Sequence, residues 1–233
     1  MKRLTQRVGN NERAVLSIGF VASTLYGGLP TLVRRIRQSR PEVDVQLVEM
    51  ISIQQIEALR SGRIDVGFGR VRASDPTLER LVLREERLVV ALLAESPLAH
   101  DTRPIALTAI EGQRLIVYPK DPRPSFADQV LSLIEDRGVR PGEIHEVREL
   151  QAALGLVAAD DGICIIPAST RWIRADLRYR LIDDEHATSP IIMSYRLNDR
   201  SGFIQLIKTL IAEIYKEKPP WLDTSYNRNI FDF

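Results

Sequence analysis

Residues 17–30, S-I-G-F-V-A-S-T-L-Y-G-G-L-P, have the pattern of a β-strand that runs directly into a helix. Residues 14–21 are apolar and β-prone, and the apolar residues that follow recur at helical spacing, which predicts a helix over about 24–38. Ser23 and Thr24 are hydroxyl residues of the kind that cap a helix start. Such a start presents unpaired backbone N–H groups and a positive helix end to whatever lies above the strand. We therefore expect an anion-binding site at this turn.

The rest of the chain alternates between predicted strands and helices joined by short connections. This alternation favours right-handed crossovers and parallel sheets, and a second α/β unit begins at strand 87–95, so that a cleft between two units is expected. The other predicted strands are 43–50, 64–69, 114–118, 143–147, 163–167, 177–182 and 190–195. The other predicted helices are 53–61, 126–137, 149–158 and 201–218, with a further start at 168–173.

Two more helix starts carry hydroxyl residues, because Ser52 with Gln55 and Ser125 with Asp128 have the spacing of a capping box. Every helix needs a cap, so one such serine alone says little about a ligand. Three on facing edges favour a site for two anionic groups. About four hydrogen bonds of roughly 1.5–3 kcal/mol each would reach micromolar affinity for a small dicarboxylate. Arg70, just beyond strand 64–69, either adds a cation to this edge or forms an ordinary surface ion pair.

The composition favours a globular protein in a reducing compartment. The 233 residues carry a net charge of +1, so the chain has no overall basic field of the kind that binds nucleic acid. The one cysteine, Cys164, lies in an apolar run, where a buried and inert thiol is expected. The apolar runs are shorter than a membrane span, and residues 1–13 lack the apolar segment of a secretion signal. We therefore expect a cytoplasmic protein with no membrane contact.

No enzyme motif is present in the sequence. It has no G-x-S-x-G, H-E-x-x-H or P-loop, and residues 67–70 lack the third glycine of a dinucleotide fingerprint. The histidines His100, His145 and His186 do not have the spacing of metal ligands. We expect no catalytic residue, no cofactor and no metal.

Three motifs resemble the effector-binding domain of LysR-type transcriptional regulators. They are L-S-I-G-F-V-A-S-T-L-Y-G-G-L-P at 16–30, E-A-L-R-S-G-R-I-D-V-G-F-G-R at 57–70 and E-V-R-E-L-Q-A-A-L-G-L-V-A-A-D-D-G-I-C-I-I-P-A-S-T at 146–170. Within this family the chain is most similar to the catechol and benzoate degradation branch, the CatR, CatM and BenM type, which responds to cis,cis-muconate. The resemblance runs from about Val15 to Asp223 with scarcely a gap.

The resemblance implies an α/β fold of the type II periplasmic-binding-protein-like class, with two Rossmann-like α/β subdomains joined by two crossover strands. Residues 14–85 plus 192–218 would form regulatory subdomain I, and residues 86–191 would form regulatory subdomain II. Residues 1–13 would be the end of a linker helix, without the DNA-binding winged helix-turn-helix that such regulators carry before it. Residues 219–233 have turn chemistry and are expected to form a poorly ordered C-terminal tail.

The resemblance also implies which residues hold the effector. The muconate carboxylates would be bound by the hydroxyl of Ser23, by Ser52 and by the backbone around residues 124–126. Relatives often have threonine where this chain has Ser52, which keeps the hydroxyl and loses a methyl contact. The full predicted effector-binding set is Val21, Ser23, Thr24, Ser52, Arg70, Pro124, Ser125 and Phe126.

Some relatives have a second, apolar pocket for benzoate. Its arginine corresponds to Arg84, and the place of its C-terminal tyrosine is taken by Glu217, whose carboxylate would repel benzoate. Glu149 lies where relatives have a glutamate linked to that arginine, and a structural Arg84–Glu149 ion pair is the alternative interpretation. We therefore expect that a secondary site of Arg84, Glu149 and Glu217 does not work as a benzoate site.

Together these features predict the inducer-sensing and oligomerisation domain of an activator of aromatic-compound catabolism, and not an enzyme. Its partners would be cis,cis-muconate or a chloromuconate, and copies of itself in a homodimer or homotetramer. Promoter DNA would be contacted only through the missing N-terminal domain, and RNA polymerase by the full-length protein. The alternatives are a solute-binding receptor of the same fold for a small carboxylate, which the missing signal peptide disfavours, and a LysR-type domain with an unrelated effector.

Overall fold

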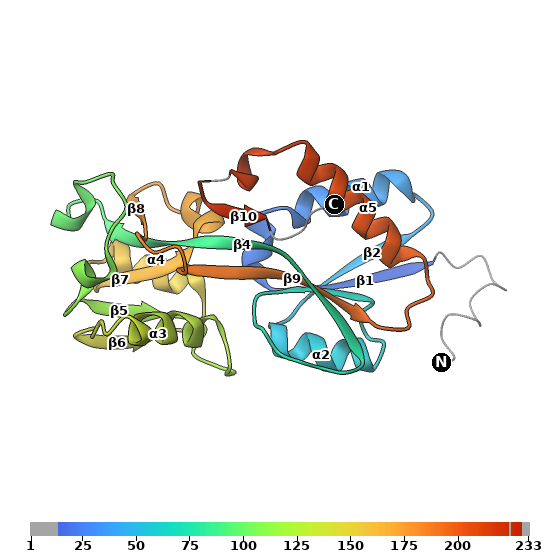
Figure 1. The fold of residues 1–233 in the computed structure, drawn as a ribbon, viewed down its shortest axis with the longest axis horizontal. Coiled ribbons are helices and arrows are strands. Elements are labelled where there is room, and N and C mark those ends of the chain that lie inside the picture. The colour runs from blue at the N-terminus through green and yellow to red at the C-terminus, as the bar shows by residue number, and fades with distance from the viewer. Residues whose placement is uncertain (1–13, 224, 230–233) are drawn as a thin grey trace.

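Two lobes follow one another along the long axis of the molecule, and the strands β4 (Leu78–Leu93) and β9 (Thr188–Arg196) run between them (Figure 1). The computed structural model describes residues 14–223 and 225–229. Lobe I contains β1 (Val15–Phe20), β2 (Asp44–Glu49), β3 (Val66–Gly69), α1 (Leu29–Ser39), α2 (Ser52–Arg60) and α5 (Phe203–Lys216). Lobe II contains β5 (Arg114–Val117), β6 (Glu143–Glu146), β7 (Ile163–Pro167), β8 (Leu177–Leu181), α3 (Phe126–Asp136) and α4 (Leu150–Ala158).

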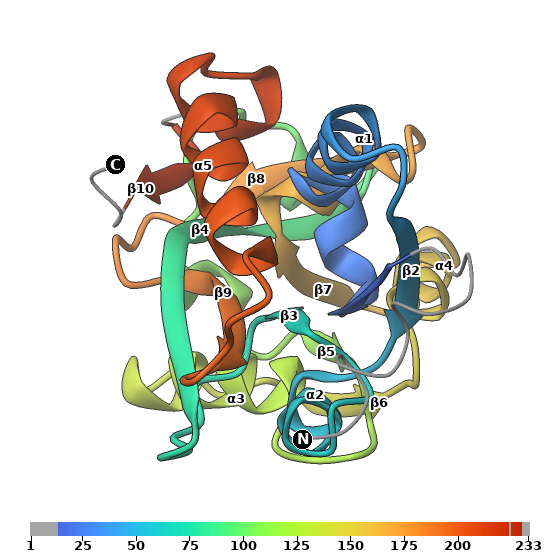
Figure 2. The same ribbon diagram turned by 90° about the vertical axis from the view of Figure 1, so that its right-hand side faces the viewer.

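In lobe I, β1 is the central strand of a parallel set. It pairs with β2 on one side, Val15 opposite Asp44, and with β3 on the other, Ile18 opposite Val66. Helices α1 and α5 cover one face of this sheet, and α2 covers the opposite face (Figure 2). The inward side of α1 is apolar at helical spacing, which buries it against the sheet. The predicted strand–helix–strand order of this half is confirmed.

Lobe II repeats this arrangement around β5, which pairs in parallel with β6 and β7. All five residues of β7 are buried, as expected for a strand covered on both faces. Cys164 in this strand is fully buried, and burial raises the pKa of its thiol. The thiol stays protonated, so the predicted inert cysteine is confirmed.

The predicted strand 87–95 is wrong in extent, because β4 begins nine residues earlier, at Leu78. From Leu78 to Arg87 it pairs with β9 in antiparallel fashion, and from Leu88 onward it pairs with β7 and β8. The start of this strand was not predicted because the stretch R-E-E-R at 84–87 is charged, and charged residues are depleted from strands. Arg84, Glu85 and Glu86 are nevertheless buried.

The predicted helix 24–38 is interrupted. A 3₁₀ helix, η1 (Ala22–Tyr26), comes first, and α1 starts after Gly27 and Gly28. Neither Ser23 nor Thr24 caps α1, because the break separates them from it. Ser23 and Thr24 were predicted as caps because they precede apolar residues at helical spacing. The two successive glycines that follow them break the helix before α1 begins.

The two predicted capping boxes have different outcomes. At α3, Ser125 and Asp128 form the capping box as predicted. At α2 the prediction is wrong, because Ser52 is the first residue of the helix and makes no cap hydrogen bond. Gln55 instead donates to the carbonyls of Met50, at 3.2 Å, and Phe68, at 3.0 Å. The side chains of Ser52 and Gln55 are therefore hydrogen-bonded to Arg70 and Phe68, which lie outside the helix, instead of capping it.

Residues 219–223 and 225–229 of the C-terminal segment are part of the fold, so the prediction of a poorly ordered tail is wrong for these residues. A 3₁₀ helix, η5 (Pro220–Leu222), is followed by β10 (Asn227–Asn229), which pairs antiparallel with β4. Asn227 holds this segment, because its amide donates to the carbonyl oxygens of Trp221 and Asp223 at 3.1 and 3.0 Å. The expected linker helix at residues 1–13 lies outside the described residues.

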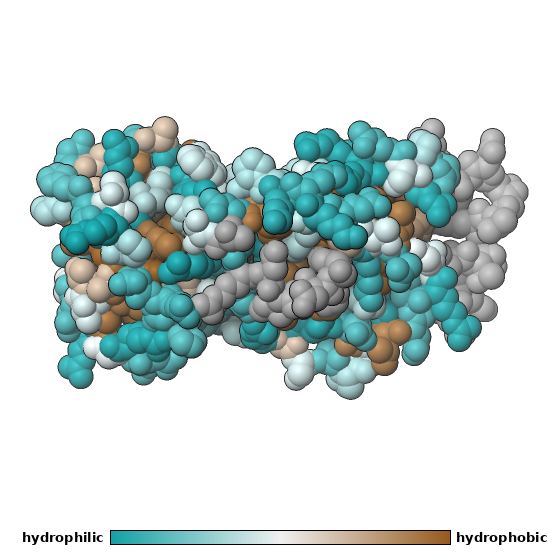
Figure 3. Space-filling model, turned by 45° about the horizontal axis from the view of Figure 1, so that its top comes forward, coloured by the Kyte–Doolittle hydropathy of each residue, from teal (hydrophilic) through white to brown (hydrophobic). Residues whose placement is uncertain are grey.

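The surface seen in Figure 3 is mostly hydrophilic, with apolar residues reaching it in patches on both lobes. Helices among residues 14–223 and 225–229 are all too short or too polar to span a bilayer.

Candidate functional site

The main cleft lies between the two lobes and has a volume of about 610 Å³. It forms where parallel strands end and helices begin, which is the usual ligand position in open α/β sheets. From lobe I come the turn after β1, the start of α2 and the residue after β3, and from lobe II the starts of α3 and α4. The structure brings seven of the predicted residues together here: Val21, Ser23, Ser52, Arg70, Pro124, Ser125 and Phe126.

Arg70 organises the lobe I side of the cleft. Its backbone N–H donates to Ser52 Oγ at 3.0 Å, and its Nε donates to Ser23 Oγ at 2.7 Å. A serine hydroxyl has one proton and two lone pairs, and Ser52 Oγ also accepts from the Val71 N–H at 3.3 Å. Within residues 14–223 and 225–229 neither Ser23 nor Ser52 donates its hydroxyl proton, so both protons can be donated to an anion in the cleft.

The charge of Arg70 is compensated within the protein. Its Nη2 lies 2.7 Å from Glu86 Oε2, and both residues are buried, with exposed fractions of 3% and 1%. Burial alone would raise the pKa of Glu86, but the charges of Arg70 and Arg84 and the N–H of Ser169 outweigh burial and lower it. The surface ion pair considered for Arg70 is therefore wrong, since the pair is buried.

The lobe II side is the N-terminus of α3. The Ser125 N–H donates to Asp128 Oδ2, while Ser125 Oγ accepts from the Ala127 N–H at 3.2 Å and donates to the Pro119 carbonyl at 3.1 Å. The hydroxyl of Ser125 is thus committed to the protein. Within the described residues, the capping box leaves the Phe126 N–H unpaired. This amide, at the positive end of an eleven-residue helix, is the donor that α3 presents to an anion.

Several residues that line the cleft were not predicted from the sequence, among them Tyr26, Tyr118, Arg148 and Gln151. Tyr118 ends the predicted strand 114–118, so the strand-end argument that found Arg70 would also have found it. Its ring lies 5.4 Å from that of Phe126 and forms an apolar wall. Burial raises the pKa of the Tyr118 hydroxyl well above its usual value, so this group stays neutral.

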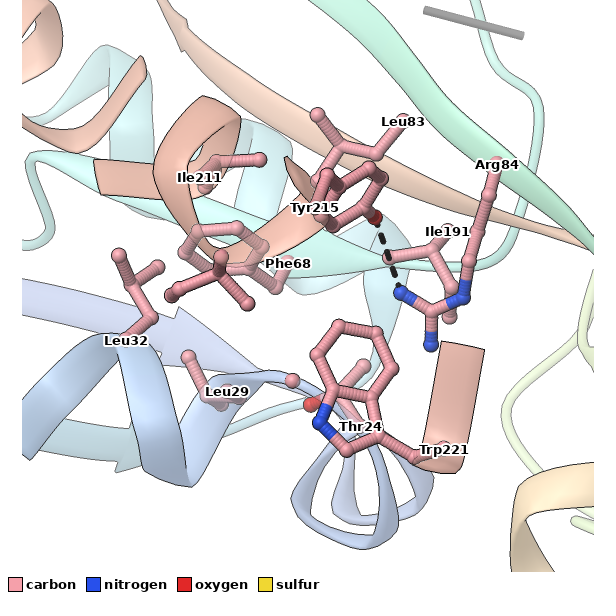
Figure 4. A pocket seen from close by; sticks show the side chains of 12 residues that line it. Thr24, Leu29, Leu32, Phe68, Leu83, Arg84, Ile191, Ile211, Tyr215 and Trp221 are labelled. Atoms are coloured by element: carbon pink, nitrogen blue, oxygen red, sulfur yellow. Dashed lines mark hydrogen bonds between the residues drawn. The ribbon is translucent and has the colours of Figure 1, made fainter. Parts of the chain in front are cut away.

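Thr24 is the one predicted effector residue that the structure does not bring to the cleft. Its hydroxyl donates to the Val21 carbonyl at 2.8 Å, and its side chain lines a second cavity on the other side of η1. This cavity measures only about 30 Å³, room for about two waters. Most of its lining is apolar and comes from α1, α5 and the strands beneath them (Figure 4).

Arg84 is the charged residue among those that line the second cavity. Its Nη1 donates to the Tyr215 hydroxyl at 3.1 Å, its Nε donates to Asn227 Oδ1 at 3.0 Å, and its guanidinium carbon lies 4.9 Å from the centre of the Trp221 ring (Figure 4). Trp221 stands across the cavity from Tyr215, with the two ring centres 6.0 Å apart. The indole therefore occupies space that a planar ligand beside Arg84 would need.

Two expectations about this cavity are wrong. Glu217 lies outside it and pairs with Arg35, while Tyr215, two residues earlier on α5, supplies the aromatic hydroxyl. Two residues correspond to about 200° around a helix, which separates the buried face from the exposed one. Glu149 lines the main cleft, and the Arg84–Glu149 ion pair is absent from the described part of the chain.

No set of three or more histidine, cysteine, aspartate or glutamate side chains within residues 14–223 and 225–229 is placed to hold a metal ion. The cleft therefore presents hydroxyl hydrogens on one wall and an amide hydrogen on the other, and both can be donated to an anion. The Arg70–Glu86 ion pair, whose charges compensate each other, lies behind the hydroxyl wall.

Comparison with known proteins identifies the family. The model of the LysR substrate binding domain matches residues 9–213. The chain belongs to the LysR substrate-binding domain family. It is 58% identical to the probable cat1 operon transcriptional activator of Acinetobacter lwoffii, over 96% of this chain and 74% of that protein. It is 44% identical to the regulator CatR of Pseudomonas putida, over 90% of this chain and 72% of that protein.

Solved structures of this family have the same fold. The effector-binding domain of BenM, a regulator from Acinetobacter baylyi, solved with its effector benzoate, is 40% identical. It superimposes with a TM-score of 0.85 over 89% of this LysR domain and 96% of that chain. The predicted type II periplasmic-binding-protein-like fold is confirmed.

Proposed function

We propose that this LysR domain is the inducer-sensing and oligomerisation part of an activator of aromatic-compound catabolism, and that it binds a small dicarboxylate such as cis,cis-muconate or a chloromuconate in the main cleft. One observation carries the proposal. The hydroxyls of Ser23 and Ser52, both held as donors by Arg70, lie across the cleft from the Phe126 amide at the start of α3. Two donor groups on opposite walls suit a ligand with a carboxylate at each end.

The energetics favour a ligand held by neutral donors. Glu86 compensates the charge of Arg70, so affinity comes from hydroxyl and amide hydrogens pointing at carboxylates. A hydrogen bond to a charged group contributes roughly 1.5–3 kcal/mol. The three donors of Ser23, Ser52 and Phe126 would together contribute about 4.5–9 kcal/mol, and the upper part of this range reaches the ~8 kcal/mol of micromolar binding.

A ligand that touches both lobes favours one arrangement of the lobes over another, and only such a difference shifts their equilibrium. The change would be passed through contacts between copies of the chain, as a homodimer or homotetramer, to DNA-binding parts elsewhere in the protein. One relative is named a probable cat1 operon transcriptional activator and another a transcriptional regulator, CatR, which supports this role. The role would be exercised in the cytoplasm, and the full-length protein would contact RNA polymerase.

Calorimetric titration with cis,cis-muconate tests the proposal. We expect micromolar binding by the wild-type domain and a loss of an order of magnitude or more in the double variant Ser23→Ala with Ser52→Ala. Ser61→Ala, an exposed serine after α2, is the matched control and should bind as the wild type does. Equal binding by all three proteins would contradict the assigned site, and no binding by the wild type would contradict the ligand class.

A further inference from the structure

Gln129 connects the two walls of the cleft. It lies on α3, one turn after the helix start that faces the cleft. Its Nε2 donates to the backbone carbonyl of Arg70 at 2.9 Å, and its Oε1 accepts from Ser189 Oγ at 3.0 Å. Since Arg70 follows β3 in lobe I and α3 belongs to lobe II, this one amide spans both lobes.

Arg70 is the same residue that orients the donors of lobe I. Its N–H and Nε hold the two serine hydroxyls, and its carbonyl is held by Gln129. A continuous series of hydrogen bonds therefore leads from Ser23 and Ser52 to α3, whose N-terminus forms the opposite wall. This series links the two walls directly, beside the strands β4 and β9 that join the lobes.

We propose that Gln129 is a positioning residue that sets the separation between the Ser23–Ser52 hydroxyls and the α3 N-terminus, and thereby selects effectors by their length. The inference rests on the proposed function, since it concerns a ligand bound at both walls. A ligand that matches the fixed separation makes its hydrogen bonds at both ends, and a shorter or longer one gives up bonds at one end.

The amide of Gln129 serves both contacts of this position. The Arg70 carbonyl needs a donor and the buried Ser189 hydroxyl needs an acceptor, and an amide supplies one of each. A glutamate would keep the acceptor for Ser189 but present an oxygen to the Arg70 carbonyl. A methionine of similar length would lose both bonds. In either variant α3 is no longer tied to Arg70, and the separation of the walls becomes variable.

Length selectivity is the readout, because a merely structural defect would weaken all ligands together. Saturated straight-chain dicarboxylates from glutarate to suberate are titrated in competition with cis,cis-muconate, on the wild type, Gln129→Met and Gln129→Glu. We expect the wild type to prefer one ligand length. For each protein, the selectivity is the ratio of the affinity for that length to the affinity for the next longer ligand. This ratio should be roughly fivefold lower in both variants than in the wild type, which is the effect of about one neutral hydrogen bond.

Two further proteins keep the test decisive. Gln205→Met alters an exposed glutamine on α5 and should retain the wild-type ratio. Ser189→Ala removes the bond that orients the Gln129 amide, and it should lower the ratio even if a Gln129 variant fails to fold. Unchanged ratios in the folded variants would overturn this inference alone, whereas a wild type that binds no dicarboxylate would overturn the proposed function and this inference with it.

Discussion

The guanidinium of Arg70 donates to the carboxylate of Glu86 at 2.7 Å, at the point where lobe I meets the strands that lead to lobe II. Both side chains are almost fully buried. The pair holds the residue that orients both serine hydroxyls, so the stability of the interior and the geometry of the cleft share one interaction. A buried ion pair of this kind adds little stability over an apolar pair, but removing one partner leaves an uncompensated charge.

The Arg70–Glu86 pair predicts a large effect of removing one partner. Glu86→Gln keeps the size of the side chain and leaves the Arg70 cation unpaired, so we expect the free energy of unfolding to fall by about 3–5 kcal/mol. Urea denaturation followed by circular dichroism measures it. Glu79→Gln, at an exposed position of the same strand, is the control and should change stability little. Similar stability losses in the two variants would contradict the role of the buried pair.

The same pair predicts a pH dependence. The pKa of Glu86 is held below its ordinary value of 4.5, so the folded state binds this proton less readily than the unfolded state. The stabilisation is fully present above pH 4.5 and is lost as the pH falls from there through the folded-state pKa. The stability difference between wild type and Glu86→Gln should therefore be constant near neutrality and shrink below pH 4.5. A difference that grows on acidification would contradict this assignment.

The position of Trp221 leads to a prediction about benzoate binding in the second cavity. Because its indole leaves only about 30 Å³ beside Arg84 and Tyr215, we expect the wild type not to bind benzoate there. Trp221→Ala should open the cavity and allow benzoate to pair with Arg84, at a stability loss below the ~3–5 kcal/mol of a fully buried aromatic residue. Calorimetric titration with benzoate checks this.

Trp172→Ala is the matched control for the cavity, since Trp172 is 76% exposed and lies elsewhere, on the 3₁₀ helix η4 (Ala168–Trp172). It should bind benzoate no better than the wild type. If the wild type binds benzoate as tightly as Trp221→Ala does, the indole is not what closes this cavity.

Replacing Ser125 should affect stability more and ligand binding less than replacing a serine of lobe I. Its hydroxyl is engaged by the Pro119 carbonyl and the Ala127 amide, so it caps α3 and does not point a free proton at the cleft. Ser125→Ala should lower the free energy of unfolding by ~1 kcal/mol and weaken muconate binding less than Ser23→Ala does. Denaturation and calorimetry on the two variants compare these effects. A binding loss equal to that of Ser23→Ala, without a loss of stability, would show that the Ser125 hydroxyl contacts the ligand.

How far sequence alone reaches depends on how local the interaction is. The capping box of Ser125 and Asp128 was predictable because its partners are three residues apart. The equal spacing at Ser52 and Gln55 misled, because Arg70 and Phe68, far along the chain, take those side chains. Seven of the 21 lining residues of the cleft belong to the predicted effector-binding set, because they lie where strands end or helices start, which is a rule of topology rather than of contacts.

The second cavity was beyond local reasoning. It is made by β4, α5 and a C-terminal segment whose turn-like composition gave no sign of its docking on Arg84. The difference between Tyr215 and Glu217 is one of helix phase, which the pattern of buried residues on α5 settles. The buried charges of β4 were equally hidden, because each is tolerated only through partners remote in sequence.

A crystal structure of the domain grown with cis,cis-muconate would show where the ligand binds. We expect density for the diacid in the main cleft, with one carboxylate within hydrogen-bond distance of Ser23 Oγ and Ser52 Oγ and the other at the Phe126 N–H. Density for the ligand beside Arg84 instead, or a main cleft without ligand at saturating concentration, would contradict this expectation.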